Sequence, residues 1–290
     1  MTNDFASRVQ RQIERLQHCS YRDIEAEVAQ KRRAWFQQPD RITRPDRPTP
    51  RQAFDLLFFD YIGLSPSDLP IVSETDNEIV WQSANPCPTL EAVKALGLDT
   101  RTVCRATREK STQAFVSQID PQLRFLRSYE EIRSHAAYCR EMIVRVDFEA
   151  MMRPAIEEAQ ISRQEGNKGY GALVVLGQRI LSRAHDTAIT QGDPSLHAEV
   201  NAIRQAVQVL GEANLSGAIL FSTCEPCPMC SSLAVWANLT TIVYGASTEE
   251  TAQLGQPCIH VSAREIVEKS SVMIEVIDGV LREECLALYR

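Results

Sequence analysis

Two short motifs in the second half of this 290-residue sequence combine residue types that bind metal ions and move protons. The first is His197-Ala198-Glu199, and the second is Glu225-Pro226-Cys227-Pro228-Met229-Cys230. Zn²⁺ prefers neutral imidazole nitrogen and thiolate sulfur, and a catalytic zinc site uses three protein ligands and leaves the fourth position to water. His197, Cys227 and Cys230 therefore predict a catalytic zinc site.

The spacing within each motif supports this chemistry. Cys227 and Cys230 lie one helical turn apart, so both sulfurs can reach one ion, and a helix N-terminus favours the thiolate form. Glu199 is two residues from His197, so it can reach the water without being a fourth ligand and can take up the water's proton. The alternative is a structural zinc site, for which Cys224 would be the spare ligand.

The elements expected around these motifs alternate between strands and helices. A helix over about 146–163 precedes a strand at 169–176, and this strand pairs with a second one at 179–183. The later elements are helices at about 196–210 and 229–238, strands at 218–222, 241–244 and 272–277, and two further helices near the C-terminus. This order predicts an α/β domain with a largely buried sheet, covering residues 143–290.

The preceding residues, 1–142, predict a mostly helical N-terminal domain of unknown function. We expect one helix through the first 36 residues, a proline-rich linker at 37–50, a helix at 51–61, a hairpin at 70–83, and short helices from 88 to 143.

At its two motifs the chain resembles the cytidine-deaminase-like superfamily of zinc deaminases, in the branch of bacterial guanine deaminases and tRNA adenosine deaminases. The resemblance covers about 145–290 and rests on Gly171-Ala172 and on segments 193–204 and 224–230. It implies a three-layer α/β/α domain with a five-stranded sheet, one Zn²⁺, hydrolytic release of ammonia with Glu199 as the proton shuttle, and commonly a homodimer.

Three further residues are candidate substrate contacts. Asp186 stands eleven residues before His197, where members of this branch usually carry an asparagine that contacts the base or ribose. An amide donates and accepts hydrogen bonds, whereas an ionised carboxylate only accepts, so Asp186 is either a selective pocket wall or a solvated loop residue. Ala198 is the second candidate. Trp236, on the same predicted helix as Cys227, is either a base-stacking platform or a core residue.

Cys87, Cys104 and Cys139 lie in the first half of the chain, and His135 is one helical turn before Cys139. They could form a second metal site, but no Cys-x-x-Cys spacing supports one, and core thiols are the simpler interpretation. The arginines between 32 and 51 are most simply part of a solvated linker, with nucleic-acid contact as the alternative.

Composition and charge narrow the function further. No stretch approaches the roughly 20 apolar residues that a membrane span needs, and the N-terminus is charged. The nine cysteines suggest free thiols or metal ligands and not disulfides. We therefore expect a cytoplasmic protein with no membrane partner. Residues 143–290 carry 11 Lys and Arg against 18 Asp and Glu, which disfavours a polyanionic substrate. Only residues 1–51 have an excess of basic side chains.

Three hypotheses remain. The first is a zinc hydrolase that deaminates a free purine base or nucleoside, guanine-like first. The second is an enzyme that edits adenosine to inosine in tRNA, with the basic N-terminal segment contacting RNA. The third is a zinc-binding module that has lost catalysis. The charge counts against the second hypothesis, and the presence of Glu199 counts against the third.

Overall fold

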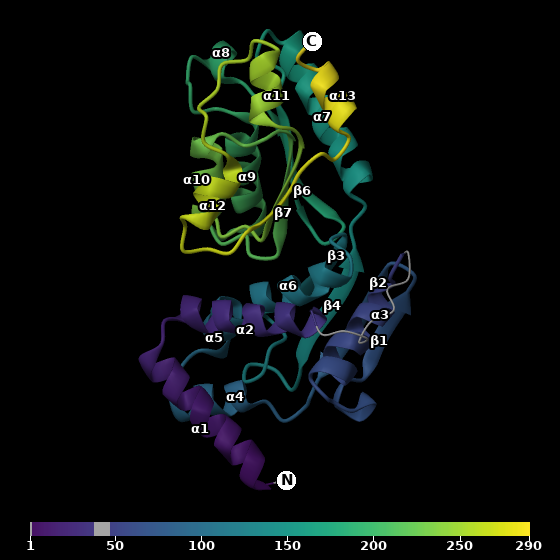
Figure 1. Ribbon diagram of the computed structural model, residues 1–290, viewed down its shortest axis with the longest axis vertical. Helices are drawn as coiled ribbons and strands as arrows, with labels where there is room; N and C mark the ends of the chain where they lie inside the picture. The colour runs from purple at the N-terminus through teal and green to yellow at the C-terminus, as the bar shows by residue number, and fades with distance from the viewer. Residues whose placement is uncertain (1, 38–46) are drawn as a thin grey trace. The chain divides into compact units, whose positions relative to one another are not determined.

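The computed structural model describes residues 2–37 and 47–290. The chain divides into two compact units, Met1–Arg145 (unit 1) and Val146–Arg290 (unit 2), and each has its own sheet (Figure 1). Within the described ranges, no helix has both the length and the apolar character that crossing a membrane requires.

Unit 2 is built around a five-stranded mixed sheet in the order β6-β5-β7-β8-β9. The strands, in chain order, are β5 (Gly171–Leu176), β6 (Arg179–His185), β7 (Ala218–Cys224), β8 (Thr241–Ala246) and β9 (Glu275–Ile277). β5 pairs antiparallel with β6 and with β7, whereas β7, β8 and β9 are parallel. The central strand β7 is buried along its whole length, as expected for a strand covered on both faces.

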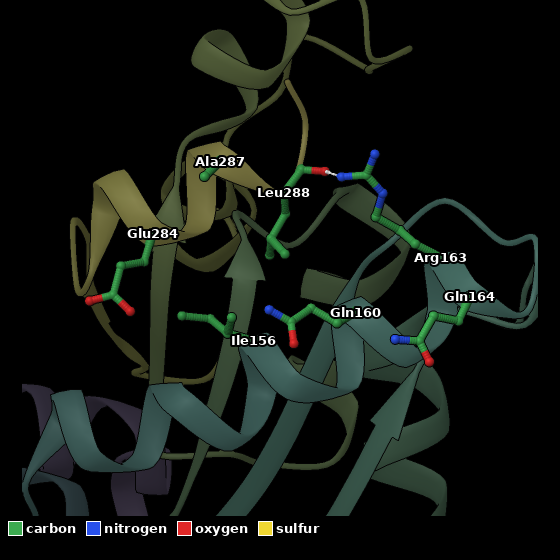
Figure 2. Close-up of a pocket in the computed structure, with 7 residues that line it drawn as sticks. All are labelled: Ile156, Gln160, Arg163, Gln164, Glu284, Ala287 and Leu288. Atoms are coloured by element: carbon green, nitrogen blue, oxygen red, sulfur yellow. Dashed lines mark hydrogen bonds between the residues drawn. The ribbon is translucent and has the colours of Figure 1, made fainter.

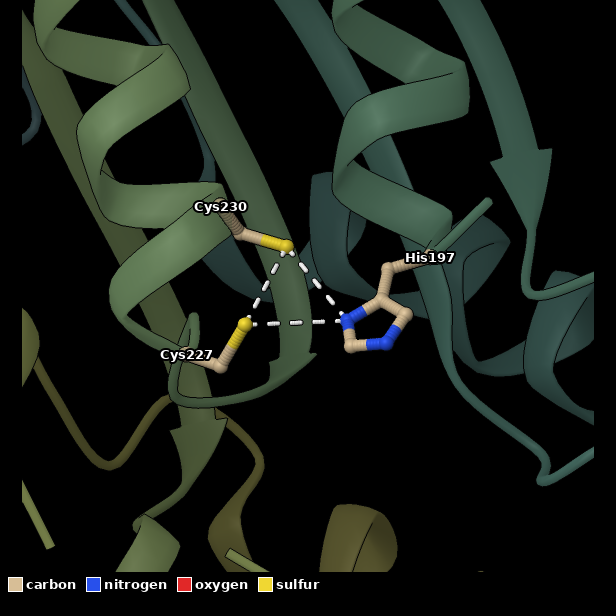
Figure 3. A group of neighbouring side chains, drawn as sticks. All are labelled: His197, Cys227 and Cys230. Carbon is tan, nitrogen blue, oxygen red and sulfur yellow. Dashed lines mark hydrogen bonds between the residues drawn. The ribbon is translucent and has the colours of Figure 1, made fainter. Parts of the chain in front are cut away.

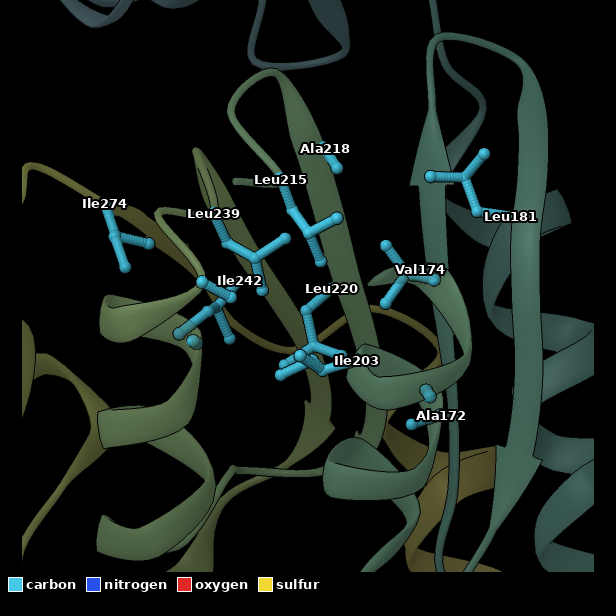
Figure 4. Close-up of a cluster of buried hydrophobic side chains, with 14 of the residues drawn as sticks. Ala172, Val174, Leu181, Ile203, Leu215, Ala218, Leu220, Leu239, Ile242 and Ile274 are labelled. Carbon is cyan, nitrogen blue, oxygen red and sulfur yellow. The ribbon is translucent and has the colours of Figure 1, made fainter. Parts of the chain in front are cut away.

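Alternate side chains of these strands enter two separate hydrophobic cores. Val174, Leu220 and Ile242 pack with Ile203 on one face (Figure 4), and Leu173, Phe221 and Val243 belong to the core on the other face. Because successive side chains of a strand point to opposite faces, this division shows that both faces of the sheet are covered. The unit is therefore a three-layer α/β/α domain, as the sequence predicts.

Helices supply the outer layers. α9 (Ala198–Leu210) and α10 (Pro228–Trp236) cover one face, and α7 (Phe148–Gln164) and α13 (Arg282–Ala287) cover the other (Figure 1). The shorter helices are α8 (Ala188–Gln191), α11 (Thr248–Gln253) and α12 (Ala263–Glu268).

Unit 1 combines helices with a four-stranded antiparallel sheet in the order β1-β2-β4-β3. Its strands are β1 (Ile71–Thr75), β2 (Glu78–Ser83), β3 (Leu123–Arg127) and β4 (Cys139–Arg145). Its helical segments are α1 (Thr2–His18), α2 (Tyr21–Phe36), α3 (Pro50–Asp55), the π-helix η1 (Leu56–Tyr61), the short η2 (Pro66–Asp68), α4 (Pro88–Ala95), α5 (Thr100–Cys104), the π-helix η3 (Arg105–Glu109) and α6 (Lys110–Ile119). An aromatic core that includes Phe54, Trp81 and Phe125 joins the helices to the sheet.

Unit 1 differs from the sequence expectations in two places. The predicted single N-terminal helix is two helices, because Ser20 has extended backbone and its hydroxyl accepts a hydrogen bond from Asp23 N at 3.2 Å, which starts α2. Strands β3 and β4 lie where short helices are expected. The hairpin β1–β2 needs further strands for stability, and β4 pairs with β2 over Glu78–Ser83. Most of the predicted linker at 37–50 lies outside the described residues.

Candidate active site

The side chains of His197, Cys227 and Cys230 converge at the beginnings of α9 and α10 (Figure 3). The two sulfurs are 3.6 Å apart, and each lies 3.6 Å from His197 Nδ1. Tetrahedral zinc with Zn–S of about 2.3 Å and Zn–N of about 2.0–2.1 Å places such ligand atoms roughly 3.5–3.8 Å apart. The triangle of donor atoms therefore fits one zinc ion.

The two helix starts bring these three residues together. His197 is the N-cap residue of α9 and Cys227 that of α10, and Pro228 fixes the first helical position after Cys227. Neither N-cap side chain accepts a capping hydrogen bond from its helix. The side chains at these two capping positions therefore do not bind their own helices and can face a metal ion instead.

The electrostatics of the triad favour one thiolate. The hydrogen bond between Cys227 and Cys230, and a further one involving His197, lower the pKa of Cys227 to about 4, although burial opposes the charge. The hydrogen bond to Cys227 also raises the pKa of His197 above its ordinary value. A site that concentrates negative charge on sulfur in this way is suited to a cation.

Glu199 lies in the first turn of α9 and is 5% exposed. Ser222 Oγ donates to its Oε1 at 3.1 Å, and the Cys230 thiol donates to its Oε2 at 3.4 Å. Burial and the nearby Cys227 raise the pKa of the carboxyl group. Its position beside the triad, with a raised pKa, is what a group that takes up and releases a proton requires.

Asp186 follows β6 and is fully buried, so the solvated-loop interpretation is wrong. Its backbone N–H donates to Tyr170 O, and its Oδ1 accepts from Ala188 N at 3.2 Å. The buried Oδ2 has no hydrogen-bond partner among the residues that the structure describes. The carboxylate contributes to the raised pKa of His197, so it lies within electrostatic range of the triad.

The other two candidates differ in position. Ala198 is buried at the start of α9, between His197 and Glu199. Trp236 ends α10 and is 82% exposed, so it is not a core residue. At 1.5 Å per residue it lies about 12 Å along the helix from Pro228. The structure therefore does not bring Trp236 to the candidate zinc site.

Sequence reasoning missed the side chains that hold this site in place. Asn201 Nδ2 donates to His185 O and Leu196 O, which fixes the loop carrying Asp186. Ser222 orients Glu199 from the middle of β7. The only available signal was spacing, since Asn201 lies one helical turn after His197, whereas nothing in the sequence links Ser222 to Glu199.

A pocket of about 530 Å³ lies between α7 and α13, on the sheet face opposite α9 and α10 (Figure 2). Arg163, which donates to Leu288 O, and Gln160 line it. None of the predicted site residues lines this pocket.

Three cysteines of unit 1, Cys87, Cys104 and Cys139, do not form a second group of this kind. Across residues 2–37 and 47–290, the triad of His197, Cys227 and Cys230 is the one set of three His, Cys, Asp or Glu residues whose ligand atoms lie within 4.8 Å of one another. The alternative of a second metal site at Cys87, Cys104 and Cys139 is therefore not supported.

Comparisons with known proteins agree with this geometry. The sequence profile of the cytidine and deoxycytidylate deaminase zinc-binding region matches residues 145–246. The tRNA-specific adenosine deaminase of Bacillus subtilis is 34% identical over 137 residues, which are 47% of this chain and 83% of that protein. The guanine deaminase of the same organism is 40% identical over 86 residues, which are 30% of this chain and 55% of that protein.

A solved structure from a study of tRNA:A34 deaminases has 26% sequence identity and a TM-score of 0.43, over 48% of this chain and 98% of that chain. These matches concern the half of the chain that carries the triad, and the profile is that of a zinc-binding region. Through unit 2, the chain belongs to the zinc-dependent deaminases of the cytidine and deoxycytidylate deaminase family, in the branch that contains guanine deaminases and tRNA adenosine deaminases, and its cofactor is Zn²⁺.

Proposed function

We propose that unit 2 hydrolytically deaminates a free purine base or nucleoside, with a guanine-like base as the first candidate, and that His197, Cys227 and Cys230 hold the zinc ion. The 3.6 Å separations of the three donor atoms support this ligand set. When bound, zinc lowers the pKa of a water molecule enough for it to attack a ring carbon near neutral pH.

Glu199 is the proposed proton shuttle. Its carboxylate accepts one proton from the attacking water and delivers it to the ring nitrogen. It then takes the second proton from the same oxygen and delivers it to the amine, which leaves as ammonia. Its burial and raised pKa support this role, because a proton shuttle works best when its pKa lies close to the pH at which it must both accept and release a proton. Ser222 keeps the carboxylate in one orientation.

The preference for a guanine-like base depends on one observation, the buried and unpartnered Oδ2 of Asp186. A carboxylate accepts hydrogen bonds and does not donate them. The ring N–H and exocyclic amine of guanine offer adjacent donors, whereas the corresponding edge of adenine mixes a donor with an acceptor. Leaving a buried polar group unpaired costs about 1–3 kcal/mol, which is enough to rank substrates.

Editing of tRNA is the second candidate. It is favoured by the tRNA-specific adenosine deaminase of Bacillus subtilis, which matches 47% of this chain and is covered over 83% of its own length. The exposed basic residues Arg8, Arg11 and Arg22 would then contact phosphates. The excess of acidic residues over 143–290 counts against it. A zinc module without catalysis is the third, and the presence of Glu199 beside the triad counts against it.

The resemblance implies a homodimer, and we propose that α10 forms part of its interface. Met229, Leu233 and Trp236 recur at helical spacing, and Met229 and Trp236 are 39% and 82% exposed. A second copy of the chain would cover this stripe. Light scattering of the wild type and of Trp236→Ser tests this, and a wild type that is monomeric at all concentrations contradicts it.

The decisive experiment measures ammonia release by the zinc-loaded full chain with guanine, guanosine, adenine, adenosine and tRNA. Glu199→Gln, of nearly the same shape, is the matched control. Turnover of guanine that this variant lacks supports the proposal. Turnover of tRNA alone, reduced by Arg8→Gln and Arg11→Gln, establishes editing instead, and zinc-loaded protein that releases no ammonia from any substrate contradicts both.

Deleting residues 1–50 is not a suitable test of the basic segment. Ile24, Val28 and Trp35 of α2 are buried, and Trp35 belongs to the aromatic core of unit 1. Their removal would disrupt that core, so the basic segment is better tested by the surface substitutions Arg8→Gln and Arg11→Gln on α1.

A further inference from the structure

Polar side chains gather at one end of the sheet of unit 1. Ser83 ends β2, Arg127 ends β3 and Cys139 begins β4, and the antiparallel pairing places these three termini together. Glu141 lies two residues after Cys139 and therefore on the same face. Its carboxylate accepts hydrogen bonds from Arg127 Nε at 2.8 Å and from Ser83 Oγ at 2.6 Å. Glu141 therefore holds the side chains of Arg127 and Ser83 in place at this end of the sheet.

The π-helix η3 adds a second set of side chains to this region. Cys104 ends α5 directly before it, and Arg105 lies over the Tyr129 ring, with its guanidinium carbon 4.2 Å from the ring centre. Arg108 donates to Thr89 Oγ1 at 2.8 Å and to Gln12 Oε1 at 3.0 Å. Helical turns of the π type are rare and occur frequently at functional sites.

Arg32 of α2 reaches the same region and is 8% exposed, so it is not part of a solvated linker. Its Nη1 donates to Thr112 Oγ1 at 2.7 Å and to Ser111 Oγ at 3.3 Å, and both hydroxyls donate in turn to Arg108 O. Two buried nitrogens, Arg32 Nε and Arg127 Nη1, have no hydrogen-bond partner among the described residues.

The positive charge of this cluster exceeds the negative charge paired with it. Within the described residues, Glu141 is the one carboxylate that forms an ion pair with Arg32, Arg108 or Arg127, and it pairs with Arg127. The other carboxylates nearby have partners of their own. Glu109 accepts from the Tyr129 hydroxyl, and Glu25 accepts from the backbone N–H groups of Lys110 and Ser111.

The three guanidinium groups also repel one another. Burial, and then Arg108 and Arg127 among other charges, lower the pKa of Arg32 to about 10. Burial raises the pKa of the neighbouring Cys104 to about 11, against the opposing effect of Arg127 and Arg108, so this thiol is neutral near pH 7. Buried charges in proteins are normally paired, because an unpaired one costs several kcal/mol.

We propose that Arg32, Arg108 and Arg127 form a second ligand site in unit 1, which binds the oxyanion of a small molecule, a carboxylate or a phosphate group, beside the thiol of Cys104. Guanidinium groups bind both kinds of oxyanion through paired N–H donors. The unpartnered Arg32 Nε and Arg127 Nη1 supply donors, and the charge of the ligand offsets that of Arg32 and Arg108. All of its residues lie in unit 1, and none of them belongs to the candidate zinc site.

Thermal unfolding of the zinc-loaded full chain tests the proposal, with inorganic phosphate and succinate as probes and sodium chloride at equal ionic strength as the reference. A ligand that binds a site in the folded state alone raises the unfolding temperature as its concentration rises, and it follows a binding curve set by the affinity of the site. We expect saturable stabilisation by phosphate or succinate, and the more effective probe identifies the class of oxyanion. Arg108→Gln should raise the half-maximal concentration at least about tenfold, because it removes a charged hydrogen-bond donor.

Arg51→Gln is the matched control. Arg51 also lies in unit 1, but it is 39% exposed and pairs with Asp55 and Glu74. Phosphate stabilises many proteins by exclusion from their surface, and such an effect would be equal in both variants. Equal stabilisation of Arg108→Gln and Arg51→Gln, or stabilisation that does not saturate, overturns the proposal.

A second measurement covers the case in which Arg108→Gln fails to fold. Alkylation of Cys104 by N-ethylmaleimide, mapped by mass spectrometry in the wild type, should slow when the effective oxyanion is bound, whereas alkylation of the exposed Cys19 should be unchanged. Identical Cys104 rates with and without phosphate and succinate contradict the proposal.

Discussion

The two units each bring cysteines close to charged groups, with opposite results. In unit 2, two cysteines on one helical turn lie 3.6 Å from a histidine nitrogen, and the carboxyl group of Glu199 lies 3.4 Å from Cys230 Sγ. In unit 1, Cys87 precedes α4, Cys104 ends α5 and Cys139 begins β4, and the positively charged groups that act on Cys104 are Arg127 and Arg108. Guanidinium groups repel a metal cation and attract an anion. Local spacing and neighbouring charge, rather than the number of cysteines, decide which kind of ligand a cluster fits.

The largest expected effect comes from replacing one cysteine in unit 2 and comparing the result with the replacement of one cysteine in unit 1. Cys230→Ala should lose zinc and all measurable turnover and should destabilise unit 2, because metal binding is coupled to folding. Cys104→Ala should keep one zinc per chain. Native mass spectrometry counts the metal, and a fully metallated Cys230→Ala protein, or a second zinc that depends on Cys104, would break the contrast.

Glu199→Gln should retain zinc and lose turnover by about 10²–10⁴-fold, because an amide cannot accept the water's proton. The rate of ammonia release and the metal content must be measured on the same sample. Unchanged turnover with full zinc occupancy would exclude Glu199 as the proton shuttle.

Asp186→Asn should alter selectivity more than turnover, because the amide adds a donor where only acceptors stand now. The measurement is the ratio of kcat/KM for guanine-type and adenine-type substrates in the wild type and the variant. We expect this ratio to change by more than about threefold, which corresponds to more than about 0.7 kcal/mol. A smaller change would leave the guanine preference without local support.

The smallest expected effect concerns His185, which precedes Asp186. Burial disfavours the charged ring, but the carboxylates of Glu158 and Glu165, each 2.9 Å from a ring nitrogen, outweigh it and raise the pKa of His185 above 6.5. These ion pairs therefore stabilise the folded state fully below pH 6.5, and their contribution is lost as the pH rises through the folded-state pKa of His185. The difference in unfolding temperature between wild type and His185→Gln, which reflects a contribution of about 1 kcal/mol or less, should therefore shrink as the pH rises above 6.5. A difference independent of pH contradicts this ion-pair role.

The parts of the molecule that the sequence predicts well depend on local patterns. The triad, Glu199 and the strands of unit 2 follow from short motifs and apolar runs, each read within a few residues. The strands β3 and β4 were missed because their stability comes from pairing with β2, which is distant in sequence. The burial of Arg32 and the exposure of Trp236 depend on which neighbours cover them, and no local pattern encodes that.

The N-cap positions of α9 and α10 have a consequence for the dynamics of unit 2. A side-chain cap normally stabilises a helix start by about 0.5–2 kcal/mol, and neither His197 nor Cys227 provides one. On the proposed ligand set, metal–ligand bonds from His197 and Cys227 would hold the first turns of both helices. In hydrogen exchange, the amides of Glu199 and Cys230 should report metal occupancy directly, whereas those in the middle of β7 should report the opening of the whole unit. On this ligand set, zinc would join the starts of two helices in addition to serving as the cofactor of the reaction.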